Sequence, residues 1–236
     1  MGARAAASGT PHHPRMGRAI LVVDVQNDFC EGGSLPVPGG SEVARPLSRL
    51  VHAVAAAGGS VFASRDWHPA KTHHFREWGG RWEPHCVQGT WGAAFHPDLD
   101  LPKGAIVVSK GMDPKAEGYS AFEAVDDSGE PLGGCLDDRG VHQLYIGGLT
   151  TDHCVLESGM DARMRGMRVS ILVDAVRAID PDEGARALHE LETAGARLVT
   201  VAEALREFEG EPLSGGGPAT SNASKHHSNP MEANHP

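Results

Sequence analysis

The residue best placed to act as a nucleophile is Cys154, in the segment Tyr145-Ile-Gly-Gly-Leu-Thr-Thr-Asp-His-Cys-Val155. The apolar run 142–146 predicts a buried strand, which two glycines and two threonines bring to an end. Thr151 and Asp152 are residue types that cap helices, so we expect Cys154 at or near the first turn of a helix. Unpaired N–H groups at a helix start carry partial positive charge, which lowers the pKa of a thiol and can hold an oxyanion.

A lone cysteine at a strand end is more often a small core residue, so a nucleophile needs a base and an orienting charge nearby. Three other apolar runs end in charged side chains. Asp24 stands at the end of run 19–25, Asp66 follows run 60–64, and Lys110 follows run 105–109. Ligand sites of parallel α/β sheets lie at the carboxyl ends of the strands. We therefore expect these side chains and Cys154 to meet at one edge of a sheet.

Histidines gather after the second of these runs. Asp66, His68, His73 and His74 fall within nine positions, and His85 follows in the segment 82–90. One carboxylate with two or three imidazoles is a ligand set for zinc, iron or manganese. The alternative is a polar loop whose histidines form ordinary hydrogen bonds. The Asp-x-His pair directly at a strand end favours the metal site.

The elements that must position these residues alternate along the chain. Apolar strand patterns occupy 19–25, 60–64, 105–109, 140–146, 168–174 and 197–201, and helical patterns occupy 41–57, 152–164 and 181–194. Such alternation predicts crossover connections and a parallel sheet with helices on both faces. Residues 18–209 would form this single domain. Residues 1–17 and 210–236, which are rich in Gly, Pro, Ser, Ala and His, are expected to be flexible tails.

Composition excludes several classes of function. The 236 residues carry a formal net charge of −10, which argues against nucleic acid or an anionic membrane as the main partner. No apolar run approaches the roughly 20 residues of a membrane span, and the N-terminus lacks the apolar core of a signal peptide. Four scattered cysteines without CxxC spacing indicate a reducing compartment, so we expect a cytoplasmic protein.

Five segments together resemble the nicotinamidases (pyrazinamidases) of the isochorismatase-like cysteine hydrolase family. They are Leu21-Val-Val-Asp-Val-Gln-Asn-Asp-Phe-Cys-Glu-Gly-Gly-Ser-Leu35, Arg65-Asp-Trp-His-Pro69, Pro84-His-Cys-Val-Gln-Gly-Thr90, Ser109-Lys-Gly111 and Thr151-Asp-His-Cys-Val155. The resemblance covers roughly residues 18–203. The segments around Asp24 and Cys154 indicate only the superfamily. The Asp-Trp-His and Pro-His-Cys segments narrow the resemblance to the nicotinamidases, because isochorismatases lack the metal ligands.

The resemblance implies a Rossmann-like, isochorismatase-type fold with a mainly parallel six-stranded sheet. It implies hydrolysis of nicotinamide to nicotinate and ammonia in NAD salvage, and of pyrazinamide to pyrazinoate. Asp24 would be the general base, Lys110 would favour the thiolate and keep Asp24 ionised, and Cys154 would be the nucleophile that forms a thioester. Backbone N–H groups of Thr150 and Cys154 would hold the oxyanion, with a cis peptide between Leu149 and Thr150.

The resemblance also implies one divalent metal ion, with zinc ahead of iron and manganese. Asp66, His68 and His85 would bind it, with His74 rather than His73 as an optional fourth ligand, and the ion would orient the pyridine nitrogen of the substrate.

Phe29, Trp82 and Tyr119 resemble the aromatic walls of the family's substrate pocket. The alternative is that they are ordinary core or surface aromatics, and for Tyr119 the two alternatives are about even. Many relatives carry Tyr where this chain has His153, so His153 is not expected to be catalytic.

Two alternatives remain open on the sequence. One is another isochorismatase-like amidase or hydrolase that needs no metal, and the other is a non-catalytic metal-binding protein. The intact set of Asp24, Lys110 and Cys154 speaks against the second. The expected partner is a small-molecule substrate, and a homo-oligomer is possible.

Overall fold

Six parallel strands form the centre of the computed structural model, which describes residues 17–210. Their order in the sheet is β3-β2-β1-β4-β5-β6, and all five pairings are parallel. The strands are β1 (Arg18–Val23), β2 (Ser60–Asp66), β3 (Ile106–Lys110), β4 (Gln143–Leu149), β5 (Arg168–Arg177) and β6 (Arg197–Val199). The predicted α/β fold is confirmed. The tails expected at 1–17 and 210–236 lie almost wholly outside the described residues.

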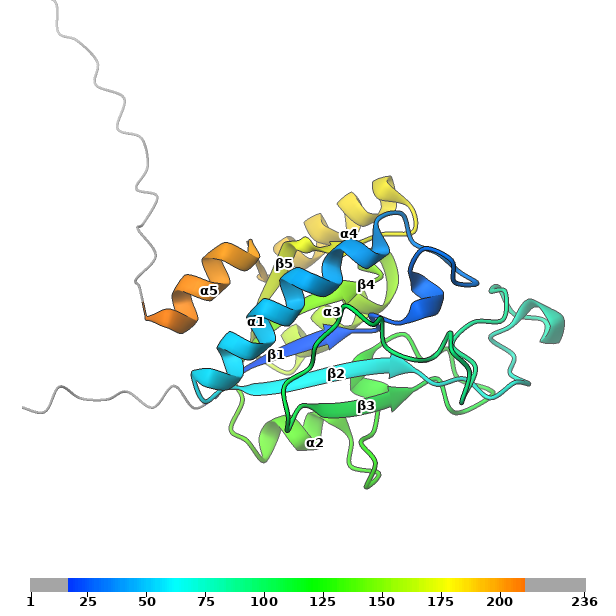
Figure 1. Ribbon diagram of the computed structural model, residues 1–236, viewed down its shortest axis with the longest axis horizontal. Helices are drawn as coiled ribbons and strands as arrows, with labels where there is room; N and C mark the ends of the chain where they lie inside the picture. Colours follow the sequence, from blue (N-terminus) through cyan, green and yellow to red (C-terminus); the bar gives the residue numbers. More distant parts are fainter. Residues whose placement is uncertain (1–16, 211–236) are drawn as a thin grey trace, which may run out of the picture.

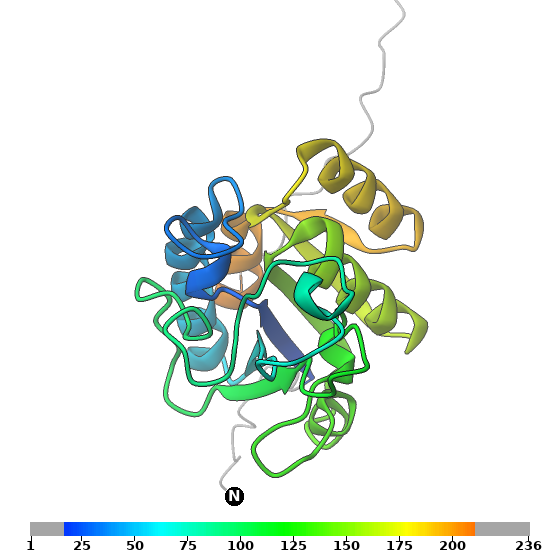
Figure 2. The same ribbon diagram turned by 90° about the vertical axis from the view of Figure 1, so that its right-hand side faces the viewer.

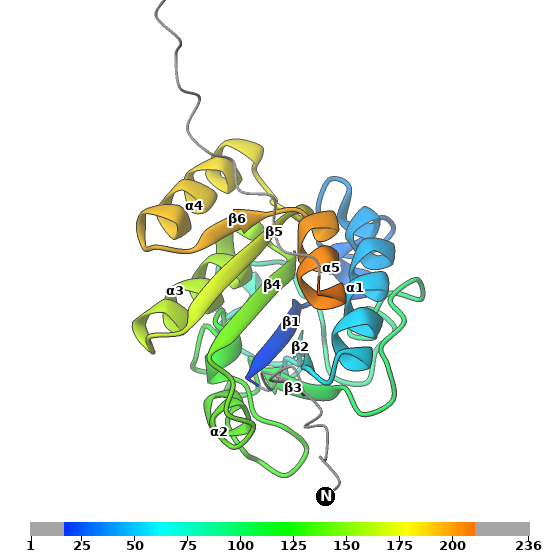
Figure 3. The ribbon, with the colours of Figure 1, turned by 90° about the vertical axis from the view of Figure 1, so that its left-hand side faces the viewer.

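Helices cover both faces of this sheet (Figure 1; Figure 3). Helices α1 (Ala44–Ala56) and α5 (Val201–Glu209) pack on one face. Helices α2 (Leu132–Asp137), α3 (Leu156–Met164) and α4 (Pro181–Thr193) pack on the other. Since both faces are covered, the central strands bury side chains on both sides, and β1 is apolar from Ala19 to Val23 without alternation.

Several element boundaries differ from the sequence-based expectation. Strands β2 and β4 run on to Asp66 and Leu149, because parallel pairing with β3 and with β5 continues past the apolar runs. The helix expected at 41–57 begins with a 3-10 turn (Gly40–Val43), and that expected at 152–164 begins with a π-turn, η5 (Thr151–Val155). Helix α2 was not predicted, since its two adjacent glycines disfavour a helix.

Helix α5 was also missed, although the chain carries a signal for it. The side chain of Thr200 accepts a hydrogen bond from Glu203 N, and the Glu203 carboxylate accepts one from Thr200 N, which makes a capping box.

The carboxyl ends of the strands face the viewer in Figure 2, where the long loops after β1, β2 and β3 gather. Short 3-10 turns shape these loops: Asn27–Phe29, Arg76–Trp78 and Ala121–Glu123. The edge therefore collects segments that are far apart in sequence, as expected for a ligand site in a parallel sheet. Among the described helices, none is both long enough and apolar enough to cross a bilayer.

Candidate active site

Cys154 lies in the π-turn that follows β4. Its side chain is buried, and the turn is closed by hydrogen bonds from Val155 N and His153 N to Thr150 O, at 3.0 and 3.2 Å. The peptide bond between Leu149 and Thr150 is cis. The capping prediction was wrong: the cap position is Thr150, and Asp152 points elsewhere.

The Asp152 carboxylate accepts hydrogen bonds from the backbone N–H groups of Ile179 and Asp180, at 3.2 and 3.0 Å. Asp152 therefore links the π-turn that carries Cys154 to the start of α4. Burial would raise the pKa of Asp152, but hydrogen bonds from His153 and from these backbone groups lower it to about 2. The carboxylate is therefore ionised across the neutral range.

Three strand ends bring Asp24, Lys110 and Cys154 together. The Lys110 ammonium lies 2.8 Å from Asp24 Oδ2 and 3.4 Å from Cys154 Sγ, and all three side chains are buried. Asp24 Oδ1 accepts a hydrogen bond from Ser64 Oγ at 2.7 Å. The carboxylate and the sulfur thus contact the same buried cation, which groups a candidate base with a thiol and with a positive charge that can stabilise the thiolate.

Burial sets the proton affinities of this group. It raises the pKa of Cys154 well above its usual value, although Lys110 acts in the opposite direction. Burial also raises the pKa of Asp24, against the effect of Lys110. Burial would lower the pKa of Lys110, but Asp24 and Asp66 raise it well above its usual value.

The expectation that the helix start lowers the thiol pKa was therefore wrong, and the lowering effect of Lys110 on the pKa of Asp24 is likewise outweighed. The desolvation cost of a buried charge exceeds both effects. The free site holds a protonated thiol beside a carboxylate whose proton affinity is increased.

Asp66 connects this group to the histidines. One oxygen, Oδ1, forms an ion pair with Lys110. The other, Oδ2, lies 3.6 Å from His68 Nε2 and 3.8 Å from His85 Nε2. Burial would raise the pKa of Asp66, but Lys110 and the neighbouring imidazoles of His68 and His85 lower it well below its usual value. A buried anion therefore faces two imidazole nitrogens.

The orientation of these two imidazoles fits a metal ion. His68 Nδ1 lies 3.0 Å from Gly111 O, and His85 Nδ1 lies 2.7 Å from Glu83 O. A carbonyl oxygen only accepts, so each Nδ1 carries the proton and each Nε2 presents a lone pair toward Asp66 Oδ2. Ligands at about 2.0–2.2 Å from one tetrahedral ion lie roughly 3.3–3.6 Å apart, close to the spacings observed. Buried His68 Nε2 has no hydrogen-bond partner among the described residues.

His74, rather than its neighbour His73, approaches this group. His74 is buried and has a ring nitrogen within 4.8 Å of those of His68 and His85, whereas His73 is exposed. Burial, together with His68 and His85, lowers the pKa of His74 to about 3, so its ring is neutral. Its Nδ1 also lies 3.5 Å from a carboxylate oxygen of exposed Glu117. A fourth neutral donor is therefore available to the same ion.

Aromatic rings surround the histidines. The Phe29 ring lies 5.4 Å from that of His85, between centroids, and Trp82 Nε1 donates a hydrogen bond to Tyr119 Oη at 2.9 Å. The ring of His153 packs against both Trp82 and Tyr119, at 5.1 and 5.6 Å. The structure thus places all three predicted wall residues near the histidines, together with His153.

Four further residues support the site and were not singled out in the sequence. Ser64 holds Asp24, as described above. Gly118 O accepts a hydrogen bond from Lys110 Nζ at 2.9 Å, Gln26 Oε1 accepts one from Asp66 N at 2.8 Å, and buried Phe75 packs against His68 and His85. Ser64 and Gln26 had a detectable signal, since each is a polar residue in or directly after an apolar run. Gly118 and Phe75 had none, because their roles depend on loop packing.

Comparisons with known proteins agree with this geometry. A family model described as the isochorismatase domain matches residues 18–203. The chain is 44% identical to the nicotinamidase/pyrazinamidase of Mycobacterium tuberculosis over 185 residues, which cover 77% of this chain and 98% of that protein.

Two solved structures show the same fold. One is the pyrazinamidase of Pyrococcus horikoshii in complex with zinc, at 40% identity and a TM-score of 0.73, covering 78% of this chain and 99% of that one. The other is PnC1 from L. infantum in complex with nicotinate, at 34% identity and a TM-score of 0.65, covering 79% and 94%. The sheet order, the matched residues and these relatives agree, and the chain therefore belongs to the isochorismatase family, as an amidohydrolase.

Proposed function

We propose that this enzyme hydrolyses nicotinamide to nicotinate and ammonia, and pyrazinamide to pyrazinoate, as a step in NAD salvage. One observation carries the proposal: Lys110 touches Cys154 and Asp24 on one side and Asp66 of the histidine group on the other. The nucleophile therefore lies beside a candidate metal site that could hold the aromatic ring of the substrate. The similar proteins whose names include nicotinamidase or pyrazinamidase support the choice of substrate.

In the first half of the reaction, Asp24 accepts the Sγ proton of Cys154, and the thiolate attacks the carboxamide carbon to form a C–S bond. Because burial raises the pKa of Asp24, this carboxylate is a better proton acceptor than an exposed one. Backbone N–H groups of Thr150 and Cys154 hold the oxyanion. Asp24 then gives the proton to the departing nitrogen, the C–N bond breaks, ammonia leaves, and a thioester remains.

In the second half, Asp24 takes a proton from a water molecule that attacks the thioester carbon. The C–S bond breaks, nicotinate is released, and the proton returns to Sγ. Lys110 stays charged throughout, because Asp24 and Asp66 raise its pKa, and it stabilises the sulfur anion at both stages.

Asp66, His68 and His85, with His74 as a fourth donor, would hold a divalent ion, zinc being the best match to this mixed N/O set. When bound, the ion supplies a Lewis-acidic anchor for the pyridine nitrogen. The residues around it restrict the ring: we propose that Phe29, Trp82 and Tyr119 pack against its faces and edges. By holding the ring, these aromatic residues orient the carboxamide toward Sγ of Cys154.

Ammonia release from nicotinamide by the purified full-length protein tests the proposal. Benzamide is the matched substrate control, because it has the same carboxamide and lacks the ring nitrogen. We expect turnover of nicotinamide and pyrazinamide, and much slower turnover of benzamide. If neither nicotinamide nor pyrazinamide releases ammonia when metal is added, the proposed substrate class is refuted.

Chelation separates this function from that of a metal-free amidase on the same fold. We expect a chelator to abolish turnover and added zinc to restore it. Activity that is untouched by chelation, in a sample shown by elemental analysis to be metal-free, would contradict a role for the ion.

A further inference from the structure

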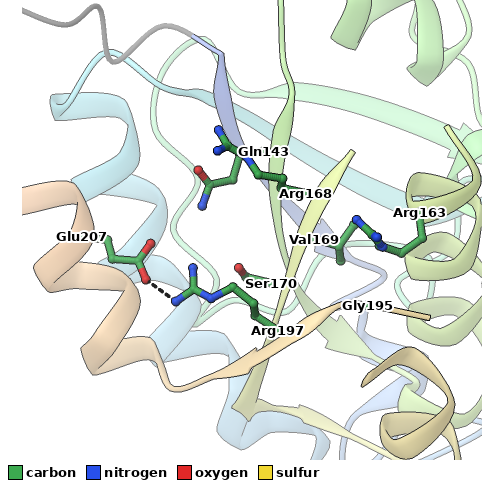
Figure 4. Close-up of a pocket in the computed structure, with 8 residues that line it drawn as sticks. All are labelled: Gln143, Arg163, Arg168, Val169, Ser170, Gly195, Arg197 and Glu207. Atoms are coloured by element: carbon green, nitrogen blue, oxygen red, sulfur yellow. Dashed lines mark hydrogen bonds and ion pairs between the residues drawn. The ribbon is translucent and has the colours of Figure 1, made fainter. Parts of the chain in front are cut away.

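A second cavity lies at the opposite end of the sheet from the candidate active site, at the amino ends of β4, β5 and β6. Its volume is about 600 Å³, and its polar lining comes from Gln143, Arg163, Arg168, Ser170, Arg197 and Glu207 (Figure 4). The six side chains come from three strands and from helices α3 and α5. Gln143 starts β4, whereas Thr150 follows its end, so the two sites are separated by roughly 20 Å of strand.

Strand register explains why these side chains meet. Gln143 pairs with Arg168, and Ser170 pairs with Arg197. Side chains of paired residues, and of residues two apart on one strand, point to the same face of a sheet. This face carries α5, from which Glu207 closes the cavity. Arg163 reaches the rim from α3 at the end of the sheet.

The cavity is positively charged within an acidic protein. Three guanidinium groups face one carboxylate, and Glu207 is already engaged by Arg197 at 2.8 Å and by the hydroxyl of Tyr145. Burial would raise the pKa of Glu207, but Arg197 and Tyr145 lower it, so the Arg197–Glu207 pair is neutral as a whole. The charges of Arg163 and Arg168 remain uncompensated, in a chain whose formal net charge is −10.

Several donors in the cavity have no partner. The guanidinium of Arg168 forms no hydrogen bond or ion pair with any other described residue, since Arg168 bonds its neighbours through the backbone alone. The hydroxyl of Ser170 likewise has none within the described part of the chain, although the residue is only 1% exposed. Arg163 uses Nε and Nη1 to bind the carbonyl oxygens of Ala194 and Met167, and these bonds hold its guanidinium in place. An unpartnered hydroxyl on the cavity wall, beside one fixed and one free guanidinium, indicates an anionic ligand.

We propose that this cavity binds a nucleoside monophosphate. Planar guanidinium groups match phosphate oxygens, and Arg163, Arg168 and Ser170 together supply a phosphate-binding set. Gln143 Nε2 donates to Tyr145 at 2.8 Å, so its amide oxygen is available to accept from a sugar hydroxyl or a base amine. A cavity of this size is within the range of small-molecule sites and much larger than phosphate alone.

Binding is tested by calorimetric titration of the full-length protein with AMP, inorganic phosphate and adenosine at one fixed, low ionic strength. AMP is expected to bind, phosphate to bind more weakly, and adenosine to bind least. Arg168→Gln is expected to weaken AMP binding by about tenfold or more, since it removes a charge-assisted contact at an exposed position where folding is unaffected. Ser170→Ala is expected to weaken it by a smaller factor.

Arg49→Gln is the matched control, because Arg49 is an exposed arginine on α1, outside the cavity lining. It should bind AMP as the unaltered protein does, and so should Cys154→Ala, because the two sites are separate. The proposal is overturned if AMP does not bind at millimolar concentration, or if Arg168→Gln and Arg49→Gln bind it equally. Equal affinity for phosphate and AMP would overturn the assignment to a nucleotide.

Discussion

At the scale of single residues, Lys110 is the group on which the site depends. Its ammonium has three protons, and Asp24, Asp66 and Gly118 O account for them, so the longer 3.4 Å approach to Cys154 Sγ is mainly electrostatic. The cation therefore stabilises a sulfur anion without having to donate to it. Its position also links the nucleophile to the histidine group through one side chain.

Replacing the nucleophile tests the covalent mechanism. Cys154→Ala and Cys154→Ser should each lower ammonia release from nicotinamide by at least about 10³-fold, because neither leaves a nucleophile that Asp24 can activate. Metal content and circular dichroism should stay unchanged. Cys135→Ala, which removes a buried thiol on α2, is the control and should retain turnover within a few fold. Substantial turnover by Cys154→Ala would instead favour attack by water.

At the scale of elements, the turn after β4 is held by contacts that are remote in sequence. Gly148 has a φ of +123°, and a Cβ there would lie 2.1 Å from Val23 O on the neighbouring strand. Asp152 then ties η5 to the loop before α4. The position of Cys154 thus depends on β1 below the turn and on α4 beside it.

The close approach at Gly148 makes it intolerant of a side chain. Gly148→Ala should prevent accumulation of folded protein or lower Tm strongly, because the clash is with backbone that cannot move without breaking β1–β4 pairing. Gly129→Ala is the matched control: its φ of +87° is also strained for alanine, but its Cβ meets open space, so it should cost about 1 kcal/mol. Equal effects of the two substitutions on Tm would show that strain alone matters.

Asp152 should contribute stability that depends on pH. Its folded pKa of about 2 lies below its usual value of 3.8, so the contribution is complete above about pH 4 and is lost as the pH falls toward 2. Asp152→Ala should lower the free energy of unfolding by roughly 1 kcal/mol at pH 7, since it removes the acceptor of two backbone hydrogen bonds. The measurement is urea unfolding of both proteins at pH 7 and pH 3.

The difference between the two proteins should shrink at the lower pH. Glu192→Ala, at an exposed position on α4, should show little effect at either pH. A difference between Asp152→Ala and the unaltered protein that stays constant from pH 7 to pH 3 would contradict this reading of the carboxylate.

At the scale of the whole molecule, helices lie on both sides of one sheet (Figure 1), with an apolar core on each face and a polar cluster at each end of the sheet. The histidine group is buried under the loops between β2 and β3. A cation bound there would connect β2, through Asp66, with the loop segments that carry His68, His74 and His85. Occupancy should therefore affect the stability of the fold as well as turnover.

Metal removal should lower Tm, because a ligand that binds only the folded state stabilises it in proportion to its saturation. We expect a chelator to reduce Tm by several degrees and added zinc to restore it. His68→Ala should contain little metal and should show almost no response of Tm to chelator or zinc, whereas His73→Ala, at an exposed position, should respond as the unaltered protein does. Full metal content in His68→Ala would show that the ligand set is wrong.

The sequence by itself determined the α/β fold, the existence of six strands along the chain and the placement of Asp24, Asp66, Lys110 and Cys154 at or just after strand ends. These features follow from local patterns: apolar runs, breakers and polar residues where the runs end. Roles at the site, the metal ligands and the cis peptide came from the resemblance to a known family. Element boundaries were less well predicted, since strand pairing and the π-turn depend on neighbouring segments.

Only the tertiary structure decided which groups touch and how strongly water is excluded from them. It showed that burial raises the pKa of Cys154, that Asp66 divides its two oxygens between Lys110 and the histidines, and that His74 rather than His73 approaches them. It also assembled the arginine-lined cavity from Arg163, Arg168 and Arg197, which lie on three different elements. Desolvation and cavity shape depend on contacts between distant parts of the chain, and local patterns carry no information about them.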